Sequence, residues 1–212
     1  GRVSGARCRG RGRVQGAPAG ARVRAGWADW VAAAAQLGCH GAGSPELWSH
    51  QREAVDLAHG GTHVVISTGT SSGKSLAYLV PALSDVLDGA DAASGRGATA
   101  LYLSPTKALA ADQMAHLTSL AIPGLRAAAY DGDTPPDERR WIRDHCQYVL
   151  TNPDLVHHSL LPGHQPRAPF LSSLRHVATV QCHANRGVFG PLLAVTLRRL
   201  RRGAPPFAPL SH

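Results

Sequence analysis

A turn rich in glycine, serine and threonine that ends in Gly-Lys-Ser is the part of this chain best suited to chemistry. Small residues let consecutive backbone N–H groups curl around phosphate oxygens, and the N-terminus of a following helix adds a positive partial charge. Lys74 can place its charge on the β- and γ-phosphates, and the hydroxyl of Ser75 is a ligand for Mg²⁺. These residues predict a nucleoside triphosphate site that contains Thr68, Gly69, Thr70, Ser71, Ser72, Gly73, Lys74 and Ser75.

The turn departs at one position from the usual phosphate-loop pattern, G-x-x-x-x-G-K-[ST]. That pattern places glycine at position 68, whereas this chain has Thr68 and brings Gly69 one residue later. A serine- and glycine-rich turn with an incidental lysine is the alternative interpretation. The flanking residues favour the phosphate site, because an apolar β-type run at 64–66 precedes the turn and a helical pattern at 76–83 follows it.

Strands and helices are predicted to alternate along most of the chain. Strands are predicted at residues 63–68, 98–104, 125–130, 147–151 and 174–180. A helix is predicted at 27–37, and the segment 47–51 leads into a second one that ends at about 58. Further helices are predicted at 74–87, 107–120, 135–146, about 154–160 and 189–202. Such alternation implies an α/β fold, with a mainly parallel sheet covered by helices on both faces. Ligands of such sheets bind at the carboxyl ends of the strands, where the phosphate turn lies. Trp141 is expected in the core, and His157 and His158 on the surface.

The formal net charge of +8 is concentrated near the two ends of the chain. Residues 1–25 contain seven arginines and no acidic residue, and residues 198–202 contain four more arginines. The remainder has eleven basic against fourteen acidic residues. We expect a disordered arginine-rich tail at 1–25, a helix and linker at 26–45, the main domain at 46–202 and a frayed tail at 203–212. Either arginine-rich end could contact nucleic acid, although disorder is the preferred interpretation of the first.

Cysteine usage and hydropathy exclude several classes of protein. The four cysteines form neither a Cys-x-x-Cys pair nor a disulfide framework, which indicates a reducing, cytoplasmic location. Neither adjacent Cys-His pair has the spacing of zinc ligands, so no structural metal is expected. The chain has no apolar run long enough to span a bilayer, so no membrane partner is expected. Because it begins with glycine and its one methionine is Met114, we expect a fragment or a processed protein.

Four further polar segments accompany the phosphate loop in a fixed order. Gln51 precedes Gly69 by 18 residues, and three segments downstream follow predicted strands. They are Ser-Pro-Thr-Lys at 104–107, Tyr-Asp-Gly-Asp-Thr at 130–134 and Thr-Asn-Pro-Asp at 151–154. Such polar side chains at strand ends suit contacts with a phosphate backbone and carry no base readout. Taken singly, each segment has an alternative, such as a solvated lysine or an ordinary proline-led helix start.

In this order, the phosphate loop and these segments resemble the first motor domain of a superfamily 2 DEAD/DEAH-box helicase. The resemblance covers about residues 46–202 and is greatest to the bacterial group with a large extra C-terminal domain. It implies a RecA-like P-loop domain that uses ATP with Mg²⁺ and grips DNA or RNA by the backbone, without sequence specificity. It also implies that Gln51 reads adenine. The nucleic-acid contacts that it implies are Pro105, Thr106, Lys107, Gly132, Asp133, Thr151, Asn152, Pro153 and Asp154.

The resemblance fails where the family places Asp-Glu-x-His after an apolar strand, the Walker B segment. Val180 and Gln181 occupy the Asp and Glu positions, and Arg-Gly-Val-Phe-Gly at 186–190 fixes the register. In the family, the Asp holds Mg²⁺ and the Glu orients the attacking water. Valine cannot ligate a hard cation, and an amide is a poor general base. We therefore expect no intact catalytic residue.

Two functions remain open at this point. The first is the ATP- and nucleic-acid-binding motor domain of a helicase, present as a fragment that cannot hydrolyse ATP or unwind alone. Unwinding needs relative motion against a second motor domain, which we do not expect in these 212 residues. The second is a non-catalytic module that binds nucleotide or nucleic acid, or a decayed gene product without activity.

Overall fold

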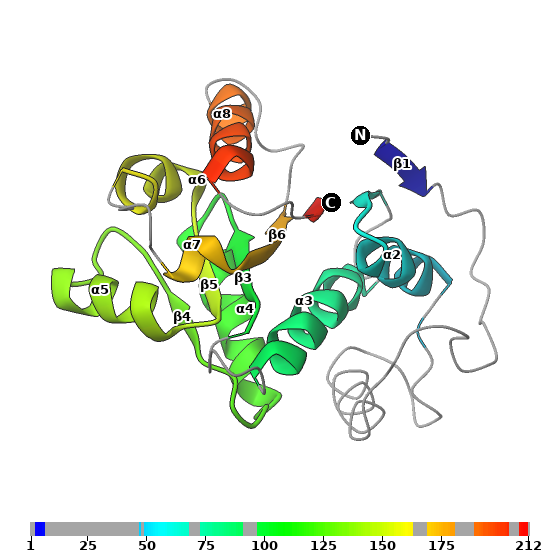
Figure 1. Cartoon of the computed structure of the whole chain (residues 1–212), viewed down its shortest axis with the longest axis horizontal. Coiled ribbons are helices and arrows are strands. Elements are labelled where there is room, and N and C mark those ends of the chain that lie inside the picture. Colours follow the sequence, from blue (N-terminus) through cyan, green and yellow to red (C-terminus); the bar gives the residue numbers. More distant parts are fainter. Residues whose placement is uncertain are drawn as a thin grey trace.

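The computed structural model describes residues 3–6, 47, 49–67, 73–90, 97–162, 169–180, 189–203 and 208–211. These residues form a sheet of seven strands in the order β1-β2-β7-β6-β3-β5-β4. The strands are β1 (Val3–Ala6), β2 (His63–Ile66), β3 (Thr99–Leu103), β4 (Ala127–Ala129), β5 (Tyr148–Thr151), β6 (Leu174–Thr179) and β7 (Ala208–Ser211). Each pair of neighbouring strands is parallel, so the carboxyl ends of the strands share one edge of the sheet (Figure 1). The predicted α/β fold is confirmed.

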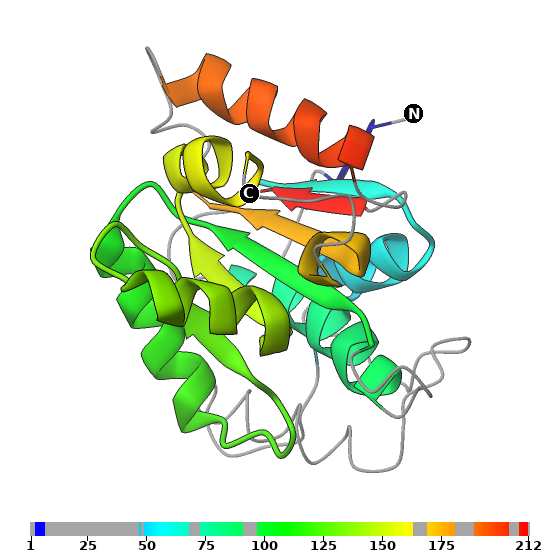
Figure 2. The same cartoon turned by 60° about the vertical axis from the view of Figure 1, so that its left-hand side comes forward.

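Helices cover both faces of this sheet. The helical elements of the described residues are α2 (Ser49–His59), α3 (Lys74–Ala90), α4 (Lys107–Ser119), α5 (Pro136–His145), α6 (Pro153–Leu155), the π-helix η1 (Val156–Leu160), α7 (Pro169–Ser172) and α8 (Phe189–Gly203). The first three pack over one core, and the others contribute to a second core. Figure 2 shows α8 lying across the sheet beside the α6–η1 segment.

Strand β3 shows why the sheet has an apolar core on each side. Successive side chains of a strand point to opposite faces. Ala100 and Tyr102 accordingly belong to the core beneath α2, α3 and α4, whereas Leu101 and Leu103 belong to the core beneath α5 to α8. All five residues of β3 are buried, as expected for a central parallel strand covered on both faces.

The two chain ends differ from the sequence prediction. Residues 1–25 were expected to be disordered and 203–212 frayed, but β1 pairs with β2, and β7 lies between β2 and β6. The neighbouring strands offer unpaired backbone N–H and C=O groups, and hydrogen bonding to them stabilises short segments that composition alone marks as irregular. Pro209 lies within β7, although proline donates no hydrogen bond to a sheet ladder and is therefore uncommon inside a sheet. The helix predicted at 27–37 lies outside the described residues.

Trp141 is on the surface, and the prediction that it belongs to the core is wrong. Its side chain is 49% exposed on α5 and stacks on the ring of His145, with the ring centroids 5.1 Å apart. The buried positions at this end of the helix are filled by Ile142 and Cys146 instead. Successive residues of a helix are turned by about 100°, so Trp141 points away from the stripe that Ile142 occupies. Among the described residues, no helix has the length and hydropathy that crossing a membrane requires.

Candidate nucleotide and nucleic-acid site

Three of the polar segments singled out in the sequence follow strands that are neighbours in the sheet, β3, β5 and β4, whereas the phosphate turn follows β2, which β7 and β6 separate from β3. The phosphate turn follows β2, Ser104 follows β3, Tyr130 follows β4 and Asn152 follows β5. Backbone hydrogen bonds continue the ladders past the strand ends, because the N–H of Ser104 donates to the carbonyl of Thr151 (2.9 Å) and that of Tyr130 to the carbonyl of Leu150 (2.8 Å). The fold therefore brings these segments, far apart in sequence, to one edge of the sheet.

Gly73 joins the phosphate turn to α3, which begins at Lys74. Its φ of +66° lies in the left-handed region that glycine adopts without a steric penalty. Thr68, Gly69, Thr70, Ser71 and Ser72 lie outside the described residues, so the predicted phosphate contacts of these five residues stay predictions. What the structure does place is the start of a 17-residue helix, with Lys74 and Ser75 half-buried in its first turn. The N–H groups and dipole at such a helix start favour an anionic ligand.

Gln51 lies directly against the phosphate turn, although 22 residues separate it from Gly73 in sequence. The side-chain amide Nε2 of Gln51 donates to the carbonyl oxygen of Gly73 (2.8 Å), and the Gln51 side chain is fully buried. The same carbonyl accepts from the N–H of Leu76 (3.2 Å). Gln51 therefore connects α2 to the end of the phosphate turn. That it also reads adenine stays a prediction.

A buried hydrogen bond joins the second turn of α3 to α4. The hydroxyl of Tyr78 donates to Oε1 of Gln113 (2.8 Å), and both side chains are buried. Tyr78 is three residues after Ser75, about one helical turn, whereas Gln113 belongs to the helix that Lys107 begins. This contact links the helix of the phosphate turn to the helix that follows β3. Sequence reasoning missed this hydrogen bond. The available signal was that Tyr78 follows Ser75 by about one helical turn and therefore lies on the same side of the helix.

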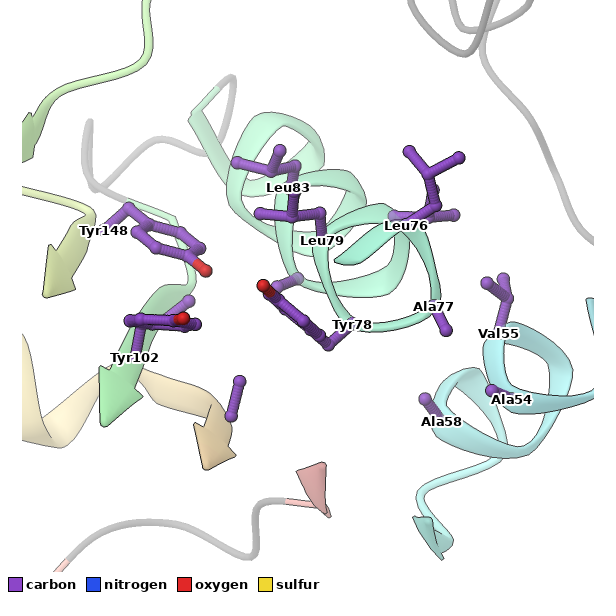
Figure 3. Packing of buried hydrophobic residues seen from close by; sticks show 14 of the residues in the cluster. Ala54, Val55, Ala58, Leu76, Ala77, Tyr78, Leu79, Leu83, Tyr102 and Tyr148 are labelled. Atoms are coloured by element: carbon purple, nitrogen blue, oxygen red, sulfur yellow. The ribbon is translucent and has the colours of Figure 1, made fainter. Parts of the chain in front are cut away.

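Two further tyrosines surround this hydrogen bond. The rings of Tyr78 and Tyr102 lie 5.7 Å apart, and Tyr148 points toward the same space from β5 (Figure 3). Burial raises the pKa of Tyr102 to about 12, and burial likewise raises the pKa of Tyr78 and Tyr148 well above the usual value of a phenol. All three hydroxyls therefore stay protonated at neutral pH, and Tyr78 can act as a donor to Gln113.

Thr106 starts α4 at the carboxyl end of β3. It is the N-cap residue, and its side-chain oxygen accepts from the N–H of Leu109 (3.3 Å). The Ser104 hydroxyl donates to the carbonyl of Thr106 (2.7 Å) and accepts from the Thr106 N–H (3.3 Å). Pro105 between them is half-buried and cannot donate a backbone hydrogen bond. These contacts fix the turn and place the exposed Lys107 at the start of the helix.

Lys107 is paired with carboxylates of the neighbouring polar segment. Its ammonium group forms an ion pair with Asp133 and lies 4.0 Å from Oδ2 of Asp131. The hydrogen bond with Asp133 raises the pKa of Lys107. Both Lys107 and Asp133 are exposed, at 57% and 85%. A nucleic-acid phosphate that approached Lys107 would therefore compete with the Asp133 carboxylate, which the sequence reasoning assigned to the same surface.

Arg139 of α5 stabilises the turn 131–134 through hydrogen bonds to its backbone. The guanidinium group of Arg139 donates to the carbonyls of Asp131 (3.1 Å), Gly132 (2.9 Å) and Thr134 (2.8 Å). Asp131 in turn accepts from the N–H groups of Asp133 (2.8 Å) and Thr134 (3.0 Å). Burial raises the pKa of Asp131, but these N–H donors and the charge of Lys107 outweigh it, so its pKa lies below the usual value. Sequence reasoning missed Arg139, because nothing in the helix pattern of 135–146 distinguishes it from Arg140 or Arg143.

The segment after β5 repeats the arrangement found after β3. Asn152 is the N-cap of α6, its Oδ1 accepts from the N–H of Leu155 (2.8 Å), and Pro153 takes the first helical position. Thr151 is buried at the end of β5, whereas Asp154 is exposed. The chain continues from α6 into the π-helix η1, an element that often marks functional sites.

Val180 directly follows β6, at the position where the family pattern has a metal-binding Asp. Its N–H donates to the carbonyl of Leu103 (3.1 Å), which extends the ladder between β6 and β3, and its side chain is 4% exposed. Val180 belongs to the core beneath α2, α3 and α4. The side chain therefore offers no ligand to a cation at this strand end. Gln181 lies outside the described residues.

A parallel α/β domain whose strand ends carry a phosphate turn and several polar segments is a RecA-like motor domain. The DEAD/DEAH box helicase family matches residues 48–210, and the chain belongs to this family.

Individual relatives agree with this assignment. The ATP-dependent helicase HRQ1 of Saccharomyces cerevisiae is 40% identical over 161 residues, which cover 74% of this chain and 14% of that protein. The uncharacterized ATP-dependent helicase YprA of Bacillus subtilis is 37% identical over 163 residues, covering 76% of this chain and 21% of that protein. A crystal structure of the DUF1998 helicase MrfA bound to DNA superimposes with a TM-score of 0.74 at 33% identity, covering 86% of this chain and 26% of that one. The chain thus spans a quarter or less of the length of HRQ1 and YprA and is similar to a helicase motor domain.

Proposed function

We propose that this chain binds ATP at the phosphate turn and the backbone of a nucleic-acid strand along the edge formed by the ends of β3, β4 and β5. The observation that carries the proposal is the position of the two lysines of the chain. Lys74 begins α3 behind the phosphate turn, and Lys107 begins α4 at the end of β3. The Tyr78–Gln113 hydrogen bond joins these two helices. This connection supports a domain in which nucleotide and nucleic acid influence each other's binding.

The residues at the nucleotide site fit ATP better than they fit Mg²⁺. Lys74 would hold the β- and γ-phosphates, and Ser75 would supply a hydroxyl to Mg²⁺. Gln51 would stabilise the end of the turn through its hydrogen bond to the carbonyl of Gly73. When bound, Mg²⁺ neutralises charge on the phosphate oxygens and so favours transfer of the terminal phosphoryl group. Val180 cannot provide the second protein ligand. We therefore propose that nucleotide binds with a weak dependence on Mg²⁺.

Hydrolysis of ATP by this chain is not part of the proposed function. The buried Val180 side chain and the amide of Gln181 replace the two carboxylates on which the family chemistry depends. Loss of a positioned base commonly lowers a rate by about 10²- to 10⁴-fold. The same observation favours the second candidate, a non-catalytic binding module or an inactive gene product. ATP and nucleic-acid binding without turnover would support the module, and the absence of both would support the inactive product.

The nucleic-acid partner that we propose is DNA, contacted through its backbone. MrfA, a relative with a similar fold, has been crystallised bound to DNA. Thr106, Lys107 and Asn152 lie at strand ends, where contacts with phosphate and sugar carry no sequence information. We also propose a cytoplasmic location, which the scattered cysteines support.

The two lysines provide a reciprocal test of this function. Binding of a fluorescent ATP analogue and of a labelled single-stranded oligonucleotide would be measured for the parent chain, Lys74→Ala and Lys107→Ala. We expect Lys74→Ala to lose nucleotide binding and keep oligonucleotide binding, and Lys107→Ala to do the opposite. Each variant is thus the matched control of the other. Equal effects of both substitutions on both ligands, or no effect of either, would contradict the assignment. A parallel titration with RNA of the same length distinguishes the two nucleic acids.

A further inference from the structure

Helix α8 presents a face of four arginines that the candidate site does not use. The core side of the helix is formed by Leu193, Thr196 and Leu200, which are buried. Arg198 and Arg202 lie one turn apart on the opposite side, because residues two positions from Leu200 are turned by about 200°. Arg199 and Arg201 flank them, and the side chains of all four are exposed. The helix contains no acidic residue.

The arginines of this face keep their charge available. Among the described residues, no carboxylate forms an ion pair with any of the four guanidinium groups. On one flank, Nη1 of Arg199 lies 3.4 Å from Nδ1 of His157 in η1. On the other flank lies His63 of β2, whose pKa is lowered by burial and then by the charge of Arg201. The positive potential of the face therefore comes from the four guanidinium groups, and no carboxylate among the described residues neutralises it.

The arginine face of α8 begins beside η1, which follows the candidate site, and extends toward the amino edge of the sheet, because α8 runs from the end of β6 to the start of the parallel strand β7. Asn152 caps α6, which leads within five residues to His157, a rise on the order of 10 Å. Helix α8 packs against both α6 and η1, and Figure 2 shows the three elements side by side. A strand that crosses Asn152 thus needs to continue by only one or two nucleotides to come near Arg199.

We propose that the arginine face of α8, formed by Arg198, Arg199, Arg201 and Arg202, is a second backbone-binding surface for the same nucleic-acid strand. This inference rests on the proposed function, since it extends the path of a strand held at Asn152 and Lys107. Nucleic acid suits the face better than an acidic protein. The centre of a protein interface is more apolar than its rim, and Val195 is the one large apolar side chain exposed on α8 among the described residues. Phosphate contacts need charge but no apolar centre.

The length of the nucleic acid separates the two surfaces. A short strand of about six nucleotides occupies the strand-end loops alone, whereas one of about twenty nucleotides reaches both surfaces. Each phosphate neutralised on a single strand contributes about 0.7 to the slope of log affinity against log salt. Removing two arginines should therefore flatten the slope for the long strand by about 1.4 and leave that for the short strand unchanged.

The experiment compares the salt dependence of binding of labelled oligothymidylates of the two lengths by fluorescence anisotropy. The test variant is Arg198→Gln with Arg202→Gln in the full chain. The matched control is Arg140→Gln with Arg175→Gln, two exposed arginines on α5 and β6. A second variant, Arg198→Lys with Arg202→Lys, keeps the charge and should restore long-strand binding. Thermal unfolding of each variant checks that the fold is retained.

The inference is overturned if the test variant loses affinity equally for both lengths, or if it binds the long strand with the slope of the parent. The second result would leave an acidic protein segment as the partner of the face. A test variant that weakens only the long strand, while its control does not, supports the proposal. Failure of the proposed function gives a different result, in which Lys107→Ala and Asn152→Ala leave the binding of both lengths unchanged.

Discussion

The hydrogen bond between Tyr78 and Gln113 gives a quantitative test of how α3 and α4 are connected. Tyr78→Phe removes one hydroxyl and keeps the ring that packs near Tyr102. The Gln113 side chain is 7% exposed, and its Nε2 has no hydrogen-bond partner among the described residues. After the substitution, the buried Oε1 also loses its donor, and the whole amide is left unpaired. Because both side chains are buried, we expect no water to replace the lost hydrogen bond.

The expected cost follows from these two contributions. A typical intramolecular hydrogen bond contributes about 1 kcal/mol, and leaving a buried polar group unpaired costs about 1–3 kcal/mol. We therefore expect Tyr78→Phe to lower the free energy of unfolding by roughly 2 kcal/mol. Tyr130→Phe is the matched control, because the Tyr130 hydroxyl bonds to Ser159 (2.7 Å), which is only half-buried. Water can reach Ser159, so this second substitution should cost less than about 1 kcal/mol.

Urea unfolding of both variants, together with Gln113→Leu and the double variant Tyr78→Phe/Gln113→Leu, completes a double-mutant cycle. The double variant should cost less than the sum of the single substitutions, since it leaves no polar group unpaired. Nucleotide affinity measured with and without oligonucleotide then reports whether the same contact transmits binding between the two ligands. If Tyr78→Phe unfolds like the parent chain and the cycle is additive, the buried hydrogen bond does not connect the helices as argued.

Three further changes have expected outcomes. Asp133→Asn removes the carboxylate that competes for Lys107, so oligonucleotide affinity should rise and its salt dependence should steepen in a filter-binding series, whereas Asp137→Asn, an exposed control on α5, should change neither. Oδ2 of Asp85 lies 2.8 Å from Nε2 of the buried His176. Burial raises the pKa of Asp85, but the hydrogen bond to His176 and the charges of His176 and His59 lower it by more. The pKa of Asp85 therefore lies below its usual value. Its contribution to stability is present above an unfolded pKa of about 3.9 and is lost as the pH falls through the lower folded value, so the unfolding free energies of the parent and Asp85→Asn should converge as the pH falls below about 4. Val180→Asp should lower the free energy of unfolding by roughly 3 kcal/mol or more, because it buries a carboxylate in an apolar core, and addition of Mg²⁺ with ATP should recover part of this loss in thermal unfolding scans.

The sequence predicted the central part of the fold because its signals there are local and agree with one another. The run 98–104 is apolar and long enough for a buried strand, and β3 at Thr99–Leu103 differs only at its ends. Thr106 and Asn152 carry the side chains that cap helices, so the starts of α4 and α6 were predictable within a residue. Such caps are decided by neighbours in sequence, which a single chain reveals.

The parts that the sequence did not predict depend on partners far away in the chain. β7 is a strand because its backbone pairs with both β2 and β6, and no property of residues 208–211 alone predicts this pairing. Arg139 is important because three carbonyls of the turn 131–134 point at it, whereas Arg140 beside it is exposed. The order of the motifs predicted that Lys107 and Asp133 would share a surface, but not that they would pair with each other.

The position after β6 shows that folding and catalysis make opposite demands on one residue. Val180 extends the ladder to Leu103 and adds apolar area to the core. An aspartate there would need a bound cation to offset its burial, because an unpaired charge in an apolar environment is costly. Valine needs no cation, so the domain keeps its sheet and its strand-end segments whether or not metal is present. In the function that we propose, the loss of the metal ligand removes catalysis without removing the fold, and the proposed binding surfaces at the sheet edge and on α8 would act without hydrolysis.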